Sequence, residues 1–437
     1  MGLGRPFWRF LAASGLSNIA DGVFQLVLPL YALHLTRSPL LISGLVIAAR
    51  LPWVFLALPA GALADRADRR MLIAAADLAR AVVIAALAGL VLADAARLWM
   101  LYALALALGF AETVSDTASS AVLPMVVHER DLDRANSRML GVQVSTNYFI
   151  GPPLGGLLAA ASFGVALAGS SVAYLLAALA VVGIAGRFRP ERSGPTTTLA
   201  ADVAEGLRYL YRHALLRRLT LMAGGIMLAF SAVDGVLPVY AVAPGPMGLS
   251  NVGFGAFIAS TAIGAVIASV VGERVTAALG PARSMRVSVL GIAVLTLSPL
   301  VVNPYLVATL WTGGAFFITI WNVIAVSTRQ RIVPEHLMGR VQASYRLVAW
   351  GALPVGAGLG GVLAEMFGLR GTFVCAGVFT VLLLFGLRGL TDEQLAAPGS
   401  ADRRAEAYAA ERGPAQQRAA EQRAVEESVS ERAADPR

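Results

Sequence analysis

The sequence predicts an all-α membrane protein in which twelve transmembrane helices form two pseudo-symmetric halves of six. Hydrophobic residues make up 57% of the 437-residue chain and charged residues only 14%, whereas a soluble domain carries about a quarter charged residues. Apolar runs of about 20 residues, long enough to cross a hydrocarbon core of about 30 Å, recur along the chain. The two halves of the chain also share short patterns at a nearly constant spacing.

Each long apolar run is expected to be a helix, because backbone groups in lipid must pair within their own segment. Hydropathy and turn residues place the first six spans near residues 11–33, 40–62, 71–93, 98–122, 138–160 and 165–186. The other six lie near 217–241, 252–272, 285–302, 305–326, 342–364 and 371–389. Asn18 and Asp21 interrupt the first run and many spans follow it, so we expect a retained helix rather than a signal peptide.

The placement of arginines predicts the orientation of the spans. Arginines concentrate in alternate breaks, for example Arg5 and Arg9, Arg69 and Arg70, Arg130 and Arg134, Arg217 and Arg218, Arg283 and Arg286, and Arg329 and Arg340. The other breaks are short and nearly neutral. Because positive loops stay in the cytoplasm, we expect a multi-pass protein of the inner membrane with both termini cytoplasmic. The basic balance is therefore attributed to topology rather than to nucleic-acid binding.

A polar connector divides the chain. We expect a first half over residues 1–186, a cytoplasmic connector over 187–216, a second half over 217–390, and a polar tail over 391–437 that is disordered or loosely helical. LPLYAL (28–33) is repeated as LPVYAV (237–242), and LGGLLA (154–159) as LGGVLA (359–364). Parallel repeats of six spans suggest a transporter whose substrate site lies at the midplane between the halves.

Two motifs resemble signatures of the major facilitator superfamily. GALADRADRR (61–70) resembles the loop pattern G-x-L-x-D-R-x-G-R-R/K, with matches at Gly61, Leu63, Asp65, Arg66, Arg69 and Arg70 and with Asp68 in place of the glycine. GPPLGG resembles the core of the antiporter signature of exporting members, at Gly151, Pro152, Gly155 and Gly156. The stretch SNIADGVFQLVLPLYALHLT (17–36) looks most similar to the macrolide-efflux and enterobactin-exporter branch.

The resemblance implies the major facilitator fold and alternating access. It implies a proton-coupled exporter of hydrophobic or amphipathic small molecules, such as a macrolide, a tetracycline or a siderophore, that uses the proton gradient and no cofactor. The charged loop is interpreted as a conformational latch, with Asp65 near a helix N-terminus or opposite arginines of the other half such as Arg340. Asp116 is expected to hold Arg69 or Arg70. The alternative is a solvated positive-inside loop.

Charged residues inside spans are functional candidates, because a charge at mid-helix costs about 2.5–3.5 kcal/mol. Asp21 and Arg50 lie at similar depth on neighbouring spans, which predicts an ion pair as readily as a direct role. Glu112 has no partner on its own helix and is the leading candidate for the proton carrier, with Asp21 second. Asp234 is interpreted as a further titrating site or as a helix cap.

One further charged pair and the apolar lining of the substrate site are predicted from less specific patterns. Asp77 and Arg80, three residues apart, are expected to form only a local pair. An apolar cavity with few polar anchors would suit an amphipathic substrate. The candidates for its lining are Trp53, Phe110, Asn147, Tyr148, Trp321 and Trp350. For any single aromatic residue, ordinary packing is an equally open interpretation.

The sequence argues against several functions other than export. The chain has no lysine, which excludes a standard P-loop. Its single Cys375 and the absence of histidine from the spans argue against a metal site and against a membrane enzyme. The alternatives that stay open are an importer or lipid flippase of the same fold and a non-transporting scaffold. The expected partners are a small-molecule substrate and the lipid bilayer, and the expected state is a monomer.

Overall fold

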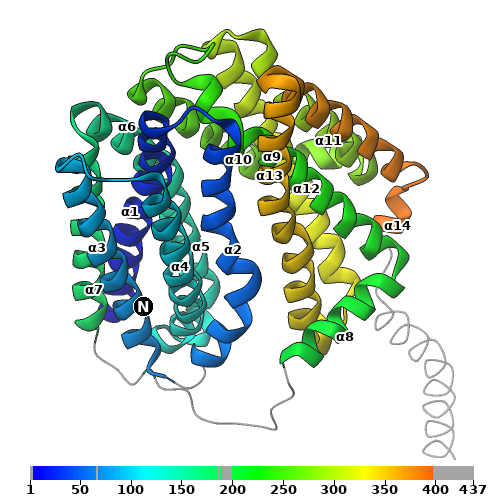
Figure 1. The fold of residues 1–437 in the computed structure, drawn as a ribbon. Helices are drawn as coiled ribbons and strands as arrows, with labels where there is room; N and C mark the ends of the chain where they lie inside the picture. The colour runs from blue at the N-terminus through cyan, green and yellow to red at the C-terminus, as the bar shows by residue number, and fades with distance from the viewer. Residues whose placement is uncertain (1–2, 65–66, 185–187, 189–198, 397–437) are drawn as a thin grey trace, which may run out of the picture.

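The computed structural model describes residues 3–64, 67–184, 188 and 199–396, and nearly all of them are helical (Figure 1). The first part of the chain forms α1 (Arg5–Leu35), α2 (Pro39–Ala64), α3 (Arg69–Leu92), α4 (Leu98–Val126), η1 (Glu129–Asp131), α5 (Leu132–Val144), η2 (Ser145–Ile150), α6 (Gly151–Ala161) and α7 (Phe163–Val182). The second part forms α8 (Leu199–Arg212), α9 (Ala214–Ala241), α10 (Asn251–Leu279), α11 (Pro281–Leu297), η3 (Ser298–Val301), α12 (Pro304–Ile332), α13 (Glu335–Leu382), η4 (Leu383–Leu387) and α14 (Asp392–Ala396).

Ten helices within the described residues are long and apolar enough to cross a membrane. One of them, α13, contains 48 residues, far more than one crossing needs. It is interrupted at Gly368, whose φ of 73° is non-helical. The Thr372 hydroxyl donates a hydrogen bond to the Gly360 carbonyl 12 residues earlier, a contact that a straight helix would place about 18 Å apart. The chain therefore turns back at Gly368, and α13 holds the last two expected spans.

The fifth expected span is the consecutive run of α5, η2 and α6. Pro152 and Pro153 lack the N–H groups that would continue the α-helical ladder into the preceding turn. The ladder widens there, and the Gly151 N–H donates to the Thr146 carbonyl five residues back, as in a π-helix. With this run and the two spans in α13, the described helices account for twelve crossings, and the fold prediction is confirmed.

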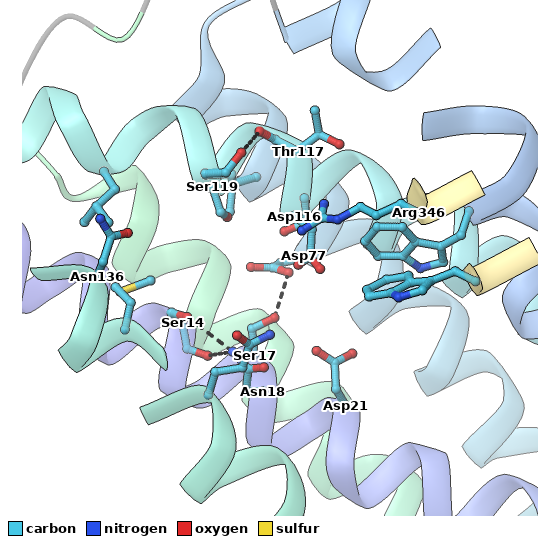
Figure 2. Close-up of a pocket in the computed structure, with 18 of the residues that line it drawn as sticks. Ser14, Ser17, Asn18, Asp21, Asp77, Asp116, Thr117, Ser119, Asn136 and Arg346 are labelled. Atoms are coloured by element: carbon cyan, nitrogen blue, oxygen red, sulfur yellow. Dashed lines mark hydrogen bonds between the residues drawn. The ribbon is translucent and has the colours of Figure 1, made fainter. Parts of the chain in front are cut away.

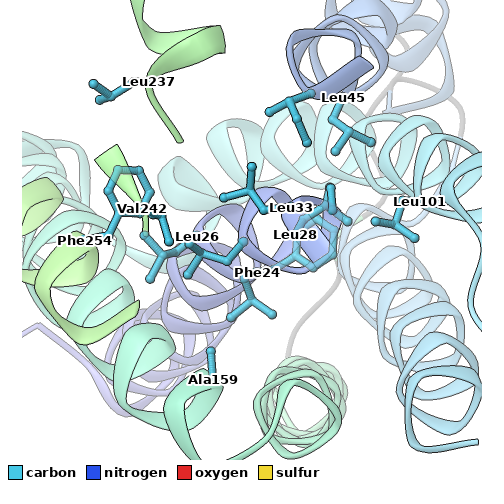
Figure 3. Packing of buried hydrophobic residues seen from close by; sticks show 14 of the residues in the cluster. Phe24, Leu26, Leu28, Leu33, Leu45, Leu101, Ala159, Leu237, Val242 and Phe254 are labelled. Carbon is cyan, nitrogen blue, oxygen red and sulfur yellow. The ribbon is translucent and has the colours of Figure 1, made fainter. Parts of the chain in front are cut away.

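The two ends of the bundle differ in how the halves meet. We call the end that carries Arg5, Arg69, Arg329 and Arg340 the basic end, and the other the opposite end. At the opposite end one buried cluster joins α1 and α2 with α9 and α10 (Figure 3). It includes Leu26, Leu45, Leu237 and Phe254. The halves are packed together there.

Polar contacts reinforce this closure at the opposite end. The Ser38 hydroxyl, just before α2, donates to Glu365 Oε1 of α13 at 2.8 Å. Arg37 donates to the Ala243 carbonyl after α9 at 3.0 Å. Backbone also meets backbone, because a Cβ on Gly255 of α10 would lie 2.5 Å from the Pro152 carbonyl of α6. Only glycine permits such an approach.

At the basic end the buried clusters are separate. One belongs to α1, α3, α4, α5 and α7 and contains Phe7, Phe10 and Val122. The others belong to the second part of the chain, around Trp321 in one and Val341 in the other. No described cluster of buried hydrophobic residues joins the two parts at this end, so the molecule is open between them there.

The connector helix and the first residues of the tail dock on the second part of the chain. Arg340 of α13 forms an ion pair with Glu205 of α8. The Ala282 N–H at the start of α11 donates to Asp392 Oδ1 of α14 at 2.7 Å, so the tail's first acidic residue caps a helix N-terminus. The rest of the expected tail and most of the expected connector loop lie outside the described residues, and the domain boundaries stay a prediction.

Candidate functional site

A cavity of about 770 Å³ lies between the two parts of the chain, on the side of the basic end (Figure 2). Its wall is formed by α1, α2, α3, α4, α5, α7 and α13. The charged residues in this wall are Asp21, Asp77, Asp116 and Arg346, and Ser14, Ser17, Asn18 and Gln143 add further polar groups. The sequence repeat predicted a site between the halves, and this cavity occupies that position.

Arg80 of α3 organises the buried charges beside the cavity. Its Nη1 lies 3.5 Å from Asp21 Oδ1 of α1 and 3.7 Å from Asp77 Oδ1 of its own helix. The side chain is only 2% exposed, and its guanidinium lies 5.3 Å from the centre of the Tyr174 ring. A buried guanidinium needs such paired acceptors, because an unpaired charge in a low-dielectric interior is costly.

Hydrogen bonds complete this charge cluster. The Tyr174 hydroxyl of α7 donates to Asp21 Oδ1, and the Ser17 hydroxyl donates to Asp77 Oδ1 at 3.2 Å. The expectation that Asp77 and Arg80 form only a local pair was therefore wrong. Arg80 joins α1 to α3, because Asp21 lies one helix turn beyond Ser17 on the face of α1 that packs toward α3 and α7.

The predicted pairing of Asp21 with Arg50 was also wrong. Asp21 pairs with Arg80, while Arg50 of α2 acts electrostatically on Asp234 of α9. The reason is that α2 packs on α4, α9 and α13 rather than closely on α1. Arg50 and Asp234 thus lie within electrostatic range of each other, on helices from the two parts of the chain.

Glu112 and Asp116, four residues apart, occupy one face of α4. Glu112 is partly buried and interacts electrostatically with Asp21, Arg80 and Asp116. It is not among the residues that line the central cavity. Asp116 lines the cavity and is exposed to it.

The charged-loop motif is only partly described. Asp65 and Arg66 lie outside the described residues, and Gly61 falls within α2. Arg70 donates to the Ile184 carbonyl at 2.7 Å, and Arg69 donates to the Ala121 carbonyl at 3.2 Å, so both bind the ends of neighbouring helices. Asp116 forms no ion pair within 4 Å with any described residue, which contradicts the expectation that it holds Arg69 or Arg70.

Asp68, the departure from the loop signature, has a structural role of its own. Its side chain accepts hydrogen bonds from the N–H groups of Arg70 and Met71 and caps α3. Its φ of −66° is accessible to any residue. The replacement of glycine therefore costs no backbone strain. The latch interpretation, which depends on Asp65, stays a prediction, and Arg340 has the ion pair with Glu205 described above.

The GPPLGG motif lies where α6 packs on α1 of the first part of the chain and on α10 of the second part. A Cβ on Gly151 would lie 2.6 Å from Gly22 Cα of α1, and one on Gly156 would lie 2.6 Å from the Asn251 carbonyl of α10. A Cβ on Gly155 would lie 3.1 Å from the Val23 carbonyl. The motif thus permits close packing on α1 and across the closed interface.

The predicted cavity aromatics divide into two groups. Trp53 of α2 and Trp350 of α13 line the cavity, and their rings meet edge to face at a centroid distance of 5.6 Å. Trp321 is 1% exposed in a separate core, and Tyr148 is 48% exposed on η2 outside the cavity lining. Phe110 lines a different, apolar groove over α2, α3 and α4. These three assignments were wrong, because the sequence does not say which neighbouring helix or cavity a given helix face meets.

Asn147 also lies outside the cavity lining. Its backbone carbonyl is the group that Gly22 approaches, and its buried side-chain Oδ1 has no hydrogen-bond partner. Sequence reasoning also missed Arg346, Tyr174 and Ser17. Arg346 follows Ser344 and Tyr345 in an otherwise apolar span, and that interruption was the signal available for it.

Comparisons with known proteins agree with this architecture. The family model described as "Transmembrane secretion effector" (MFS_3) matches residues 7–414. The multidrug efflux pump Tap of Mycolicibacterium fortuitum is 29% identical over 397 residues, which cover 86% of this chain and 94% of the pump. The enterobactin exporter EntS of Salmonella choleraesuis (strain SC-B67) is 25% identical over 374 residues, which cover 82% of this chain and 86% of the exporter.

Solved structures share the fold. A bacterial homologue of the human lysosomal transporter Spinster, in an inward-facing and unoccupied conformation, superposes with a TM-score of 0.67 at 14% identity and covers 90% of this chain and 97% of its own. A bacterial homologue of the iron transporter ferroportin, also inward-facing, superposes with a TM-score of 0.66 at 17% identity and covers 89% of this chain and 100% of its own.

Proposed function

Because the chain belongs to the transmembrane secretion effector family of the major facilitator superfamily, we propose that it is a proton-coupled exporter of hydrophobic or amphipathic small molecules. The observation that carries the proposal is the central cavity, which has carboxylates in its wall, a buried charge cluster behind it, and an opening at one end only. The names of the relatives support export rather than import, since they include an efflux pump and an exporter.

The side of the membrane that the cavity faces is inferred from the positions of the arginines. If the basic end faces the cytoplasm, as the positive-inside rule favours, the open cavity faces the cytoplasm and the packed opposite end closes it to the outside. An exporter must load its substrate from this state. Rocking of the two parts around the cavity would then release the substrate on the other side.

Proton coupling is assigned to Asp21 and Glu112. Asp21 lies in the cavity wall and shares Arg80 with Asp77. Protonation of Asp21 would therefore remove one of the two ion pairs that hold the Arg80 guanidinium. Glu112 lies within electrostatic range of both Asp21 and Arg80, so protonation of either carboxylate alters the other. One proton moving through about 100–200 mV supplies roughly 2.3–4.6 kcal/mol, which sustains a substrate gradient of tens to about a thousandfold.

Transport into inside-out membrane vesicles energised by a proton gradient would test this function. The probes are a panel of fluorescent drugs and a siderophore, and a protonophore should abolish uptake of any transported compound. Glu112→Gln should abolish proton-driven uptake, whereas Glu273→Gln, at an exposed glutamate of α10, should leave it unchanged. Uptake that survives both the protonophore and Glu112→Gln would reject proton coupling. Uptake of no compound would favour an importer, a flippase or a scaffold.

A further inference from the structure

The carboxylates in the cavity wall differ in whether they have ion-pair and hydrogen-bond partners. Asp21 and Asp77 both pair with Arg80, and each accepts a hydrogen bond from a neighbouring hydroxyl. Asp116 is exposed to the same cavity and has no hydrogen bond or ion pair with a described residue. Its electrostatic neighbours are Glu112, Arg80, Asp77 and Arg346. Asp116 is therefore the carboxylate in this wall that is available to a ligand.

Arg346 is the one cation among the described residues of the cavity wall. It extends from α13 toward Asp116 on α4, across the space between the two parts of the chain (Figure 2). It does not reach ion-pair distance within 4 Å, and its guanidinium lies 5.5 Å from the centre of the Trp350 ring. A positive group thus already lies beside an aromatic face and an unpaired carboxylate, where a cation is stabilised by both.

We propose that the cavity selects organic cations with an apolar body, which bind between Asp116 and the Trp53–Trp350 pair and displace Arg346 from this position. The proposal rests on the proposed function and assigns a substrate class to the same cavity. The aromatic pair supplies a flat apolar surface, and Asp21, Asp77 and Glu112 add negative charge around it. Arg80 is already engaged by two carboxylates, so an anionic compound of the same size has only Arg346 as a counter-ion.

The proposal predicts opposite effects on cation binding for substitutions of Asp116 and Arg346. If Arg346 competes with the substrate for Asp116, its removal strengthens cation binding, whereas removal of the Asp116 charge weakens it. A purely structural interaction between the two residues would weaken binding in both variants. An anion site on Arg346 would instead lose anion affinity when the arginine is replaced.

The test is equilibrium binding to the purified full-length protein in detergent, without a proton gradient. Tetraphenylphosphonium and tetraphenylborate have nearly the same size and opposite charges that do not depend on pH. The cation should bind at least tenfold more tightly than the anion, Asp116→Asn should weaken cation binding about tenfold, and Arg346→Met should strengthen it several-fold. Arg283→Met, at an exposed arginine of α11, and Trp321→Phe, in a separate core, should change neither affinity.

Replacement of Trp350 by leucine should weaken cation binding more than anion binding, because both ions lose apolar surface but only the cation also loses the cation–π interaction. Equal affinities for the cation and the anion, no cation binding, or a loss of cation affinity in Arg346→Met would each overturn the proposal. Because these measurements involve no transport, such a result would leave proton-driven export standing. Conversely, a failure of uptake in vesicles would not alter the binding preference.

Discussion

At the residue scale, Arg80 is the side chain on which the buried charges depend. It is 2% exposed and pairs with two carboxylates from two helices. Removing the cation would leave Asp21 and Asp77 buried without compensation, and loss of one member of a buried ion pair typically costs about 3–5 kcal/mol. We therefore expect Arg80→Met to lower the thermal unfolding temperature of the detergent-purified protein. Arg97→Met, at an exposed arginine before α4, should leave it unchanged.

A double substitution tests whether Asp21 and Arg80 interact. Asp21→Asn in the Arg80→Met background removes one of the uncompensated charges and should recover part of the lost stability. If the two substitutions are additive, Asp21 and Arg80 do not interact in the folded protein. Such a result would exclude the charge cluster described here.

Sequence reasoning identified the titratable residues of the site better than it identified their partners. Asp21, Trp53 and Trp350 were predicted as site residues, and all three line the cavity. Asp116 lines it too, although it was expected to hold an arginine of the charged loop, whereas Glu112 does not. The choice between Arg50 and Arg80 for Asp21 depends on which helices pack together. Periodicity gives the face of a helix but not its neighbour, so that choice required the tertiary arrangement.

At the element scale, helices departed from the predicted spans where proline and glycine act. The fifth span is divided by a π-helical turn before Pro152, and the last two spans run into each other at Gly368. Hydropathy predicts that a segment is apolar but not how its hydrogen bonds are arranged, so neither feature could be predicted from it. The docking of Asp392 on the start of α11 was missed for a related reason, since a capping contact between segments 110 residues apart leaves no local pattern.

Gly368 gives an element-scale prediction. Its φ of 73° lies in the left-handed region, and a Cβ there would meet nothing within 4 Å, so conformation rather than space requires glycine. Gly368→Ala should destabilise the protein by about 1–2 kcal/mol. Gly351→Ala, in the helical part of α13 and equally uncrowded, should be neutral or slightly stabilising. Thermal unfolding of both variants measures the difference, and equal unfolding temperatures would show that the turn at position 368 does not require glycine.

At the scale of the whole molecule, the two ends have different constructions. The opposite end is held by a continuous hydrophobic cluster, close backbone contacts and the Ser38–Glu365 hydrogen bond. The basic end has separate clusters and an open cavity between them. Alternating access requires that the packed end separate and the open end close, so the contacts at the opposite end must be broken in each cycle.

This requirement predicts the effect of fixing the opposite end. In a Cys375→Ser background, Ser38→Cys and Glu365→Cys would place two thiols where a 2.8 Å hydrogen bond now joins α2 to α13. Bridging them with a short bis-thiosulfonate should abolish export in inside-out vesicles, and a reductant should restore it. Tetraphenylphosphonium binding should survive the bridge, because the cavity stays open at the basic end. Each single-cysteine variant treated with the same reagent controls for modification alone, and export that continues through the bridged protein would show that the opposite end need not open.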